Sequence, residues 1–418
     1  DVYSEYQARL LKAGAMDFDD LLRNTVELFR RFPEVLGHYQ RRFRHVLVDE
    51  YQDTNRVQNE MVLMLSAESG DVCVVGDADQ CLPPGTMIRT PDGEVPIEHI
   101  REGDLVLGAN GGRRPAPGVV AKVMAGRYSG WTAEVHAGGR VLRGTPHHII
   151  PARMTLHPDQ WLVYLMYRAD RGWRVGQTKS MRPDSSGRLD VGYRVRANQE
   201  HADAIWVLQV CSSKAETSYW EARYAAEYGL PTACFRGVGR RLSMDEEWRD
   251  RLYATLDTGP RAKLLLDDLH LHPDFPHYRP ANGARRSTLN LTMFSDRRGA
   301  RPGHRVQWST NRASVAELMT ERGIPVKPGR REGTFLLEAF RTDYAEAVEI
   351  ARAAADAGSM HVRRRMVVAG EIYDFTPLSH LRPGMTVLVE GADGWEEVVV
   401  DEVVFDLYDG PVYDLEVS

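Results

Sequence analysis

Cysteine is scarce in this chain of 418 residues, and long apolar runs are missing. The four cysteines are Cys73, Cys81, Cys211 and Cys234. No two of them form a C-x-x-C pair, which argues against a disulfide scaffold or a zinc finger and favours a reducing compartment. No apolar stretch approaches the roughly 18 residues that cross a bilayer, and no signal peptide precedes the first helical pattern. We therefore expect a cytoplasmic protein without membrane contact.

A strong excess of one charge is also missing. The formal net charge of -6 does not indicate a polybasic nucleic-acid binder over the whole chain. The length exceeds the roughly 100 to 200 residues that one core usually serves, so we expect several folding units.

Two short apolar segments end in acidic or amide groups. HVLVDE, residues 45–50, ends in Asp49 and Glu50, and DVCVVGDADQ, residues 71–80, ends in Gln80. An amphipathic helical pattern lies between them, which predicts two buried parallel strands of an α/β sheet. Polar groups at the carboxyl ends of such strands occupy the edge at which these sheets bind ligands.

The letters around these strands resemble an enzyme family. Three segments carry the resemblance: MDFDDLL at 16–22, DEYQDTN at 49–55 and VVGDADQ at 74–80. They are similar to segments of the UvrD/PcrA/Rep superfamily-one DNA helicases. The resemblance implies that Asp49 binds Mg²⁺, Glu50 is the base of ATP hydrolysis, and Gln80 couples the γ-phosphate to movement on DNA. ATP and Mg²⁺ would be its cofactors. No G-x-x-x-x-G-K-[ST] loop occurs, so we do not expect this chain alone to hydrolyse ATP well.

The helicase pattern stops between Gln80 and Cys81. Three later segments occur in order: CLPPGTMIRTPDGEVPIEHIREGDLVLG at 81–108, GTPHH at 144–148 and FDLYDGPVYDLEV at 405–417. The Asp92-Gly93 pair in the first of them predicts a β-hairpin turn. Together the three resemble the splicing blocks of inteins, the Hint fold. This fold would be mostly β, with a pseudo-twofold pair of halves.

Protein splicing would start at Cys81. Its sulfur would attack the carbonyl carbon of Gln80 and convert the peptide bond into a thioester, an N–S acyl shift. By the resemblance, His148 supplies the proton to the leaving nitrogen, Thr145 orients the oxyanion side, and Asp414 tunes the proton transfers. No cofactor is needed. His147 is the alternative proton donor, although on a strand it would face the opposite way.

The resemblances divide the chain into four expected parts. They are a helicase ATPase fragment at 1–80, the first Hint half at 81–152, an inserted domain at 153–361 and the second Hint half at 362–418. The chain begins within a helical pattern and stops before the His-Asn pair that should end an intein. We therefore expect missing helicase halves and missing C-terminal intein blocks.

The inserted segment weakly resembles a nuclease. WLVYLMYRADRGWRVGQTKS, residues 161–180, predicts a hairpin, and TSYWEARYAAEYGLP, residues 217–231, predicts a helix closed by a glycine. A hairpin tyrosine, an arginine and a helical glutamate resemble the GIY-YIG homing endonucleases. The candidates are Tyr164, either Arg194 or Arg196, and Glu221 as ligand of a Mg²⁺ ion. Leu162, Val163 and Arg174 depart from that pattern, so an inactive relic stays open beside a DNA-cutting enzyme.

The rest of the insert gives weaker signals. HRVQWSTNRASVAELMTERGIPV, residues 304–326, faintly resembles half of a LAGLIDADG-type nuclease, without its acidic helix. Five arginines would suit a DNA backbone, with solvated surface as the alternative: Arg285, Arg286, Arg297, Arg298 and Arg305. His270, His272 and His277 flank the sequence HPDFP, which favours an irregular surface loop over a metal site.

The sequence thus predicts a multidomain chain: an α/β P-loop-type helicase fragment, then a mostly-β Hint fold with an inserted α+β domain. Its expected function is that of an ATP-dependent DNA helicase interrupted by an intein, whose removal by autocatalytic splicing restores the ATPase motif. The alternative is a site-specific homing endonuclease, active or relic, that acts on the helicase gene.

Overall fold

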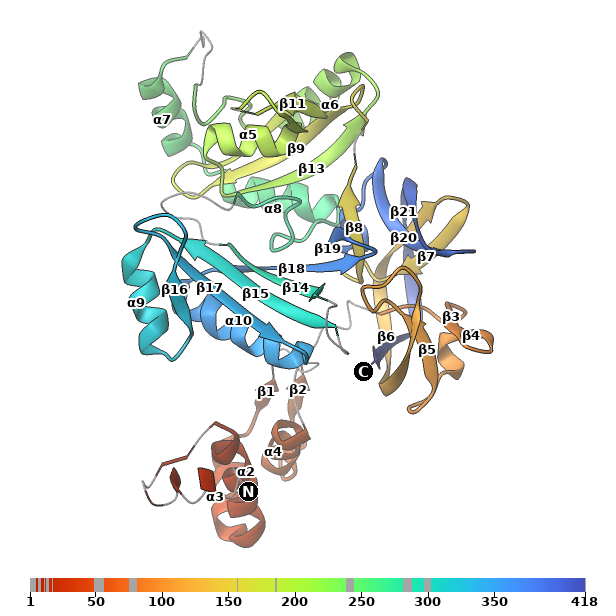
Figure 1. The fold of residues 1–418 in the computed structure, drawn as a ribbon, viewed down its shortest axis with the longest axis vertical. Coiled ribbons are helices and arrows are strands. Elements are labelled where there is room, and N and C mark those ends of the chain that lie inside the picture. The colour runs from red at the N-terminus through yellow and green to blue at the C-terminus, as the bar shows by residue number, and fades with distance from the viewer. Residues whose placement is uncertain are drawn as a thin grey trace. The chain divides into compact units, whose positions relative to one another are not determined.

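The chain falls into two compact units, Asp1–Ala78 and Asp79–Ser418. The computed structural model describes residues 5–6, 9–10, 12, 15–16, 18–48, 56–74, 81–155, 157–184, 186–237, 244–280, 288–296 and 302–417. Figure 1 gives the order of the elements along the chain by colour. Within the described residues, no helix is long and apolar enough to cross a membrane.

The first unit contains helices and a parallel strand pair. Its elements are α2 (Phe18–Arg31), α3 (Pro33–Arg42), β1 (Val46–Val48), α4 (Arg56–Ser66) and β2 (Val72–Val74). Val46 pairs with Val72 and Val48 with Val74, so β1 and β2 are parallel, with α4 as the crossover. The predicted parallel pair is confirmed. Its predicted burial is wrong at Leu47, which is 75% exposed because the described part of this unit places no element over it.

The Hint-like part of the second unit is built mostly of strands. Its first half contains β3 (Met87–Thr90), β4 (Gly93–Pro96), η3 (Ile97–His99), β5 (Leu105–Gly108), β6 (Ala116–Ala137), β7 (Arg140–Gly144) and β8 (Ile149–Met154). Its second half contains β18 (His361–Val368), β19 (Glu371–Pro377), η4 (Leu378–His380), β20 (Met385–Gly391) and β21 (Gly394–Val417). The order hairpin, 3-10 turn, strand and long strand therefore occurs twice, as the predicted pair of halves requires.

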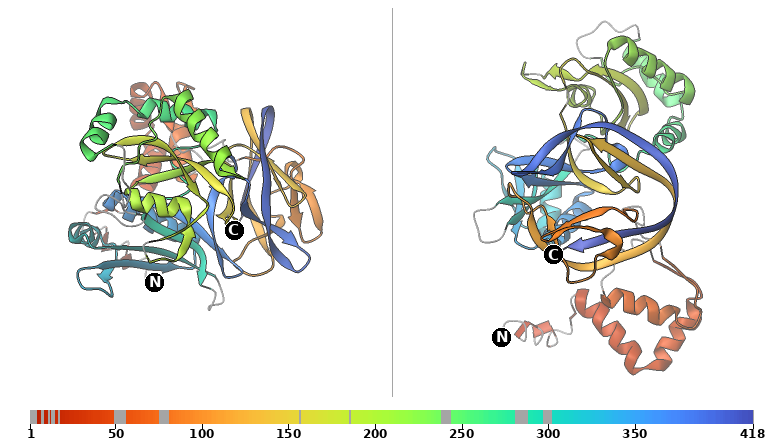
Figure 2. Two further views of the ribbon diagram at one scale, coloured as in Figure 1. Left: turned by 90° about the horizontal axis from the view of Figure 1, so that it is seen from above. Right: turned by 90° about the vertical axis from the view of Figure 1, so that its right-hand side faces the viewer.

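The two halves are joined through their long strands. β6 and β21 pair in an antiparallel ladder that runs from Ala137 opposite Val400 to Val120 opposite Val417. Figure 2 shows these two strands curving side by side in its right-hand view. The shared core packs Ala133, Ala152 and Leu378 against both halves. The carboxyl end of β21 thereby returns to the start of the first half.

The inserted segment begins with an antiparallel sheet and several helices, as the predicted α+β class requires. Its elements are β9 (Trp161–Arg168), β10 (Gly172–Lys179), β11 (Met181–Pro183), β12 (Leu189–Val191), α5 (Gly192–Glu200), β13 (Ala204–Cys211), α6 (Lys214–Tyr228), α7 (Glu246–Thr255) and α8 (Gly259–Asp268). The central sheet has the order β10-β9-β13. The predicted hairpin and helix are both present, and α6 ends at Gly229 with φ 65°.

The second part of the insert has a core of its own. Its elements are β14 (Thr288–Asp296), β15 (Gly303–Thr310), α9 (Ala313–Glu321), β16 (Val326–Pro328), β17 (Phe335–Arg341) and α10 (Tyr344–Gly358). Trp308, Met319 and Ala351 lie in this core, apart from the cores around β9. β14 pairs in parallel with β18, so the sheet continues from the insert into the second Hint half. Residues 153–361 therefore hold more than one core.

Candidate active site

Cys81 is half-buried and is held by a single residue from the end of β7. The Cys81 N–H donates to Thr145 Oγ1 at 2.9 Å, and the Thr145 hydroxyl lies 3.1 Å from the Cys81 carbonyl oxygen. The Thr145 N–H donates to that same oxygen at 2.9 Å. Thr145 is fully buried, so these bonds form out of water. One residue thus fixes both polar backbone groups of the cysteine.

Neighbouring contacts bring three segments together around Cys81. Leu82 and Tyr413 exchange backbone hydrogen bonds of 2.8 and 2.9 Å, which sets the end of β21 beside the cysteine. Gly144 permits the approach of β7, because a Cβ there would lie 3.0 Å from Leu82, 2.9 Å from Leu378 and 3.3 Å from the Cys81 oxygen. A larger residue at the glycine of GTPHH would therefore clash with its neighbours.

The turn that follows Thr145 is held by the second Hint half. The His148 N–H donates to the Thr145 oxygen at 3.0 Å and closes the turn. From η4, the Leu378 N–H donates to the His148 oxygen at 2.9 Å, and the Ser379 N–H donates to the Pro146 oxygen at 3.0 Å. The position of the turn consequently depends on η4.

Asp414 lies in the electrostatic reach of His148. Burial raises the pKa of the Asp414 carboxyl, while a hydrogen bond from the Leu415 N–H and the charge of His148 act in the opposite direction. His147 has a different neighbour, since its ring meets His272 edge to face at 5.1 Å. The structure therefore brings Cys81, Thr145, His148 and Asp414 together, and it turns His147 towards the insert.

Residues that the sequence interpretation missed lie behind this site. His380 is 1% exposed and Arg382 is 8% exposed, both at the end of η4. His277, placed by sequence in a surface loop, is partly buried, and its ring contacts His380. The loop is irregular and exposes Pro273 and Asp274, as expected, but the sequence did not predict that His270 and His277 contact the Hint part. A signal was present in the chain: PIEHIR at 96–101 is repeated as PLSHLR at 377–382.

The candidate nuclease residues divide between two faces of the sheet β10-β9-β13. Tyr164 is buried on the α5 side, where its hydroxyl lies 3.1 Å from Arg174 Nη1 and 3.4 Å from Arg196 Nε. Arg174 and Arg196 both pair with the buried carboxylate of Glu200. Arg196, and not Arg194, is thus the arginine beside Tyr164. The guanidinium of Arg194 instead stacks over the Tyr278 ring.

Glu221 lies on the other face. It bonds to Gln177, which pairs with Val163 in the core on the α6 side. Neighbouring strand residues alternate between faces, so the sheet separates Glu221 from Tyr164. The expectation that Tyr164, Arg194 and Glu221 form one site is not met by this geometry.

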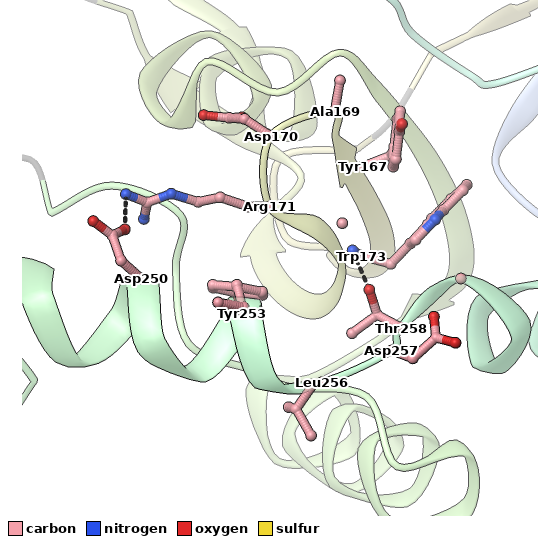
Figure 3. Close-up of a pocket in the computed structure, with 13 residues that line it drawn as sticks. Tyr167, Ala169, Asp170, Arg171, Trp173, Asp250, Tyr253, Leu256, Asp257 and Thr258 are labelled. Carbon is pink, nitrogen blue, oxygen red and sulfur yellow. Dashed lines mark hydrogen bonds and ion pairs between the residues drawn. The ribbon is translucent and has the colours of Figure 1, made fainter.

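A hollow of about 700 Å³ lies beside the turn between β9 and β10 (Figure 3). Tyr167, Trp173 and Tyr253 line it, and Arg171 pairs with Asp250 at its rim. The Trp173 N–H donates to Thr258 Oγ1 at 3.0 Å. None of the candidate nuclease residues lines this hollow.

The predicted helicase residues Asp49, Glu50 and Gln80 lie outside the described residues. So do Arg285, Arg286, Arg297 and Arg298 of the insert. In the part of the chain that the structure does describe, no group of three or more His, Cys, Asp or Glu residues has the arrangement of a metal site. The expected Mg²⁺ ligands Asp49 and Glu221 therefore stay predictions.

Comparison with known proteins identifies the two parts on either side of Cys81. Residues 1–82 match the UvrD/REP helicase N-terminal domain, and residues 80–153 match the Hint domain. The chain joins a UvrD/REP helicase segment to a Hint domain. The overlap of the two matches at residues 80–82 coincides with the break in the helicase pattern before the cysteine.

The relatives of the helicase segment are close but much longer. It is 54% identical over 82 residues to the ATP-dependent DNA helicase PcrA of Bacillus subtilis, covering 20% of this chain and 11% of that protein. It is 52% identical over 91 residues to the ATP-dependent DNA helicase UvrD1 of Mycobacterium leprae, covering 19% of this chain and 12% of that protein. The chain thus spans about a tenth of the length of these relatives.

Among solved structures, two inteins or intein-like domains match with low scores. A bacterial intein-like domain from Clostridium thermocellum is 22% identical, with a TM-score of 0.14, covering 27% of this chain and 72% of that one. A splice-inactive variant of the AceL NrdHF class 3 split intein is 14% identical, with a TM-score of 0.18, covering 27% of this chain and 97% of that one.

Proposed function

We propose that the Hint domain removes itself from a helicase by autocatalytic protein splicing, which begins with an N–S acyl shift at the Gln80–Cys81 bond. The observation that carries the proposal is the double hold of Thr145 on the backbone of Cys81, with His148 and Asp414 at the same site. Such a hold fixes the nitrogen that must leave, and pre-organisation of this kind lowers an activation barrier.

The proposed step exchanges one acyl bond for another. The Cys81 thiol loses its proton, and Sγ attacks the carbonyl carbon of Gln80. The bond from that carbon to the Cys81 nitrogen breaks, and the nitrogen takes up a proton to become an amine. The products are a thioester between Gln80 and Cys81 and a new amino group on Cys81.

The residues around Cys81 suit the two proton movements. The Thr145 hydroxyl accepts from the Cys81 N–H and so holds in place the nitrogen that must take up a proton as the bond breaks. His148, with Asp414 near it, is our candidate for the acid that supplies this proton. The role of Thr145 on the oxyanion side stays a prediction, because Gln80 lies outside the described residues.

For the host protein we propose ATP-dependent DNA helicase activity after excision. The likeness to PcrA and UvrD1 supports this, together with the parallel pair β1–β2 that precedes the motifs at 49–55 and 74–80. Asp49 and Glu50 would serve Mg²⁺ and the attacking water, and Gln80 the γ-phosphate. Excision would remove the insertion that follows Gln80.

The acyl shift can be tested on the full chain by intact mass. Incubation at neutral pH with dithiothreitol should release residues 1–80 as a thioester or acid, and the Cys81→Ala variant should stay uncut. Release that persists in Cys81→Ala would contradict the proposed thioester.

A second candidate function, DNA binding by the insert, is favoured by one sheet face. On β14, β15, β17 and β18 the face away from α9 and α10 is polar: Asn290, Thr292, Arg305, Gln307, Glu338, Arg363 and Arg365. Arg305 lies over the Phe340 ring and within electrostatic reach of Glu338, and Arg365 bonds to Thr292 at 3.2 Å within reach of Asp374. Such a face suits a phosphate backbone.

Binding and cutting can be separated in one experiment. The full chain should shift a DNA duplex carrying the uninterrupted helicase gene at low salt, and Arg305→Ala should weaken the shift. Mg²⁺-dependent nicking that disappears in Glu221→Ala would support the homing endonuclease, whereas binding without nicking would support a relic. Equal binding by wild type and Arg305→Ala would reject this face.

A further inference from the structure

The Hint domain contains the same short turn twice. PIEHIR at 96–101 forms η3, and PLSHLR at 377–382 forms η4. The N–H of Ile100 donates back to Ile97 at 3.2 Å, and the N–H of Leu381 donates back to Leu378 at 3.1 Å. After each turn a glycine with φ near 90° bonds to the long strand, so the two copies agree in geometry.

The two copies differ in what covers them. In the first copy His99 and Arg101 are exposed. In the second copy His380 is 1% exposed and Arg382 is 8% exposed. Since the backbone geometry is the same, the difference comes from the segment that packs on the second copy.

That segment is the loop at residues 269–280 of the insert, together with β13. The His272 N–H donates to His380 Nε2 at 2.7 Å, and His277 Nε2 donates to the His380 carbonyl oxygen at 2.7 Å. Arg382 donates to the Val207 oxygen of β13 at 3.1 Å. The side chains of His380 and Arg382, which would otherwise face solvent, are thus hydrogen-bonded to the insert.

Both ring nitrogens of His277 form hydrogen bonds in this position. Its Nδ1 accepts from the Val207 N–H at 3.0 Å, so its Nε2 must carry the hydrogen that reaches His380. Burial, with the charge of Arg382, lowers the pKa of His277 to about 3. The ring therefore stays neutral, which keeps one donor and one acceptor in place.

The second copy in turn holds the catalytic turn. Leu378 and Ser379 of η4 donate to the His148 and Pro146 oxygens, and the ring of His147 meets His272. Two hydrogen-bonded steps therefore join the insert loop to the turn that carries Thr145 and His148.

We propose that the insert loop 269–280 is a positioning element of the splicing centre, which acts through His277 and His380 on the turn at 145–148. This inference rests on the proposed splicing function. The insert is then a working part of the Hint domain, and His277 is a positioning residue that touches no reacting atom.

The test compares three variants of the full chain. His277→Ala should slow the thiol-dependent release of residues 1–80 by about 10- to 100-fold, because small displacements of catalytic groups have effects of that size. His277→Gln offers an acceptor and a donor in similar places and should recover most of the rate. His99→Ala, a change at the exposed counterpart of His380, should release at the wild-type rate.

A second readout follows the turn itself by amide hydrogen exchange. In His277→Ala, peptides that contain residues 144–150 and 376–382 should exchange faster, while peptides from α10 and β17 should be unchanged. Unchanged exchange at the turn, or a wild-type release rate in His277→Ala, would overturn the positioning role. If the wild type releases nothing, the proposed splicing step fails, and exchange at the turn alone decides the positioning role.

Discussion

At the scale of single residues, the Cys81 backbone shows how the site is made. If no residue packed on Cys81, water would satisfy its backbone N–H and its carbonyl oxygen. Here the buried Thr145 satisfies both, with its hydroxyl and with its own N–H. The hydroxyl both accepts and donates here, which a small apolar side chain could not do.

Replacing Thr145 by valine keeps its shape and removes the hydroxyl. The Cys81 N–H would then be left without its partner, at a cost of about 1 to 3 kcal/mol. We expect the thiol-dependent release of residues 1–80 to slow by roughly 5- to 150-fold, since each 1.4 kcal/mol is tenfold in rate. Intact mass against time measures the rate. Thr145→Ser should stay close to wild type, and a slow serine variant would mean that the methyl group matters instead.

The sequence alone could propose one site made of four residues, because each lies in a short motif whose neighbours are also informative. They are Cys81, Thr145, His148 and Asp414. The sequence could not predict a role for His277, because its hydrogen bond to His380 joins residues 103 positions apart in the chain. Proline-rich spacing around His277 is typical of exposed loops, and only the structure shows that its ring contacts His380 of η4. The same limit applies to Glu221, because the side of the sheet that a helix covers is set by the topology of the whole insert.

At the scale of elements, close approach between β7 and η4 depends on Gly144. The position is buried, and a methyl group there would press on Leu82, Leu378 and the Cys81 oxygen. The strand and the 3-10 turn come from different Hint halves, so this glycine sets their separation at the active site.

We expect Gly144→Ala to lower stability by about 1 to 3 kcal/mol, as overpacking usually does. It should also slow the release of residues 1–80, because the Cys81 oxygen must move. Thermal unfolding and the release assay measure the two effects. Gly108→Ala is the matched control, since no atom lies within 4 Å of a Cβ built there. Loss of stability with an unchanged rate would show that the separation is not important for the chemistry.

The insert is held together by a buried charge cluster between β10 and α5. Arg174 is 3% exposed and pairs with Glu200, which is fully buried and also accepts from the Phe235 N–H at 2.8 Å. Burial lowers the pKa of Arg174, but Glu200, Tyr164 and Tyr253 together outweigh it and the net shift is upward. Arg174 is therefore charged at neutral pH.

Arg174→Met should destabilise the insert by about 3 kcal/mol, because it leaves the Glu200 carboxylate buried with fewer partners. Urea unfolding measures this change. Arg223→Met on α6 is the control: Arg223 pairs with Glu227 in solvent, and its loss should make no measurable difference. If both variants unfold alike, the cluster contributes nothing to the stability of the insert.

At the scale of the second unit, the insert and the Hint domain meet at a group of histidines, of which His272 lies 3.9 Å from the Asp274 carboxylate. The group contains four histidines and one arginine: His147, His272, His277, His380 and Arg382. Burial lowers the pKa of His277, so its ring is neutral. Burial, with His277 and Arg382, also lowers the pKa of His380 well below its usual value. Protonation of this group would place like charges together in a buried site, so acid should separate the loop from η4.

The direction of the pH effect follows from linkage. An unfolded histidine has a pKa near about 6.5, and that of His277 in the folded chain is about 3. Between these values the unfolded state binds more protons, so stability falls as pH falls below about 6.5, by about 1.4 kcal/mol per pH unit for each such histidine.

We expect the urea concentration at which the loop 269–280 unfolds to be lower at pH 5 than at pH 7. Pulsed hydrogen exchange on peptides from the loop measures this midpoint. In His277→Gln the slope should be smaller, because one of these histidines no longer titrates. His157→Ala should keep the wild-type slope, since that side chain is 72% exposed. An equal slope in wild type and His277→Gln would mean that acid acts elsewhere in the chain.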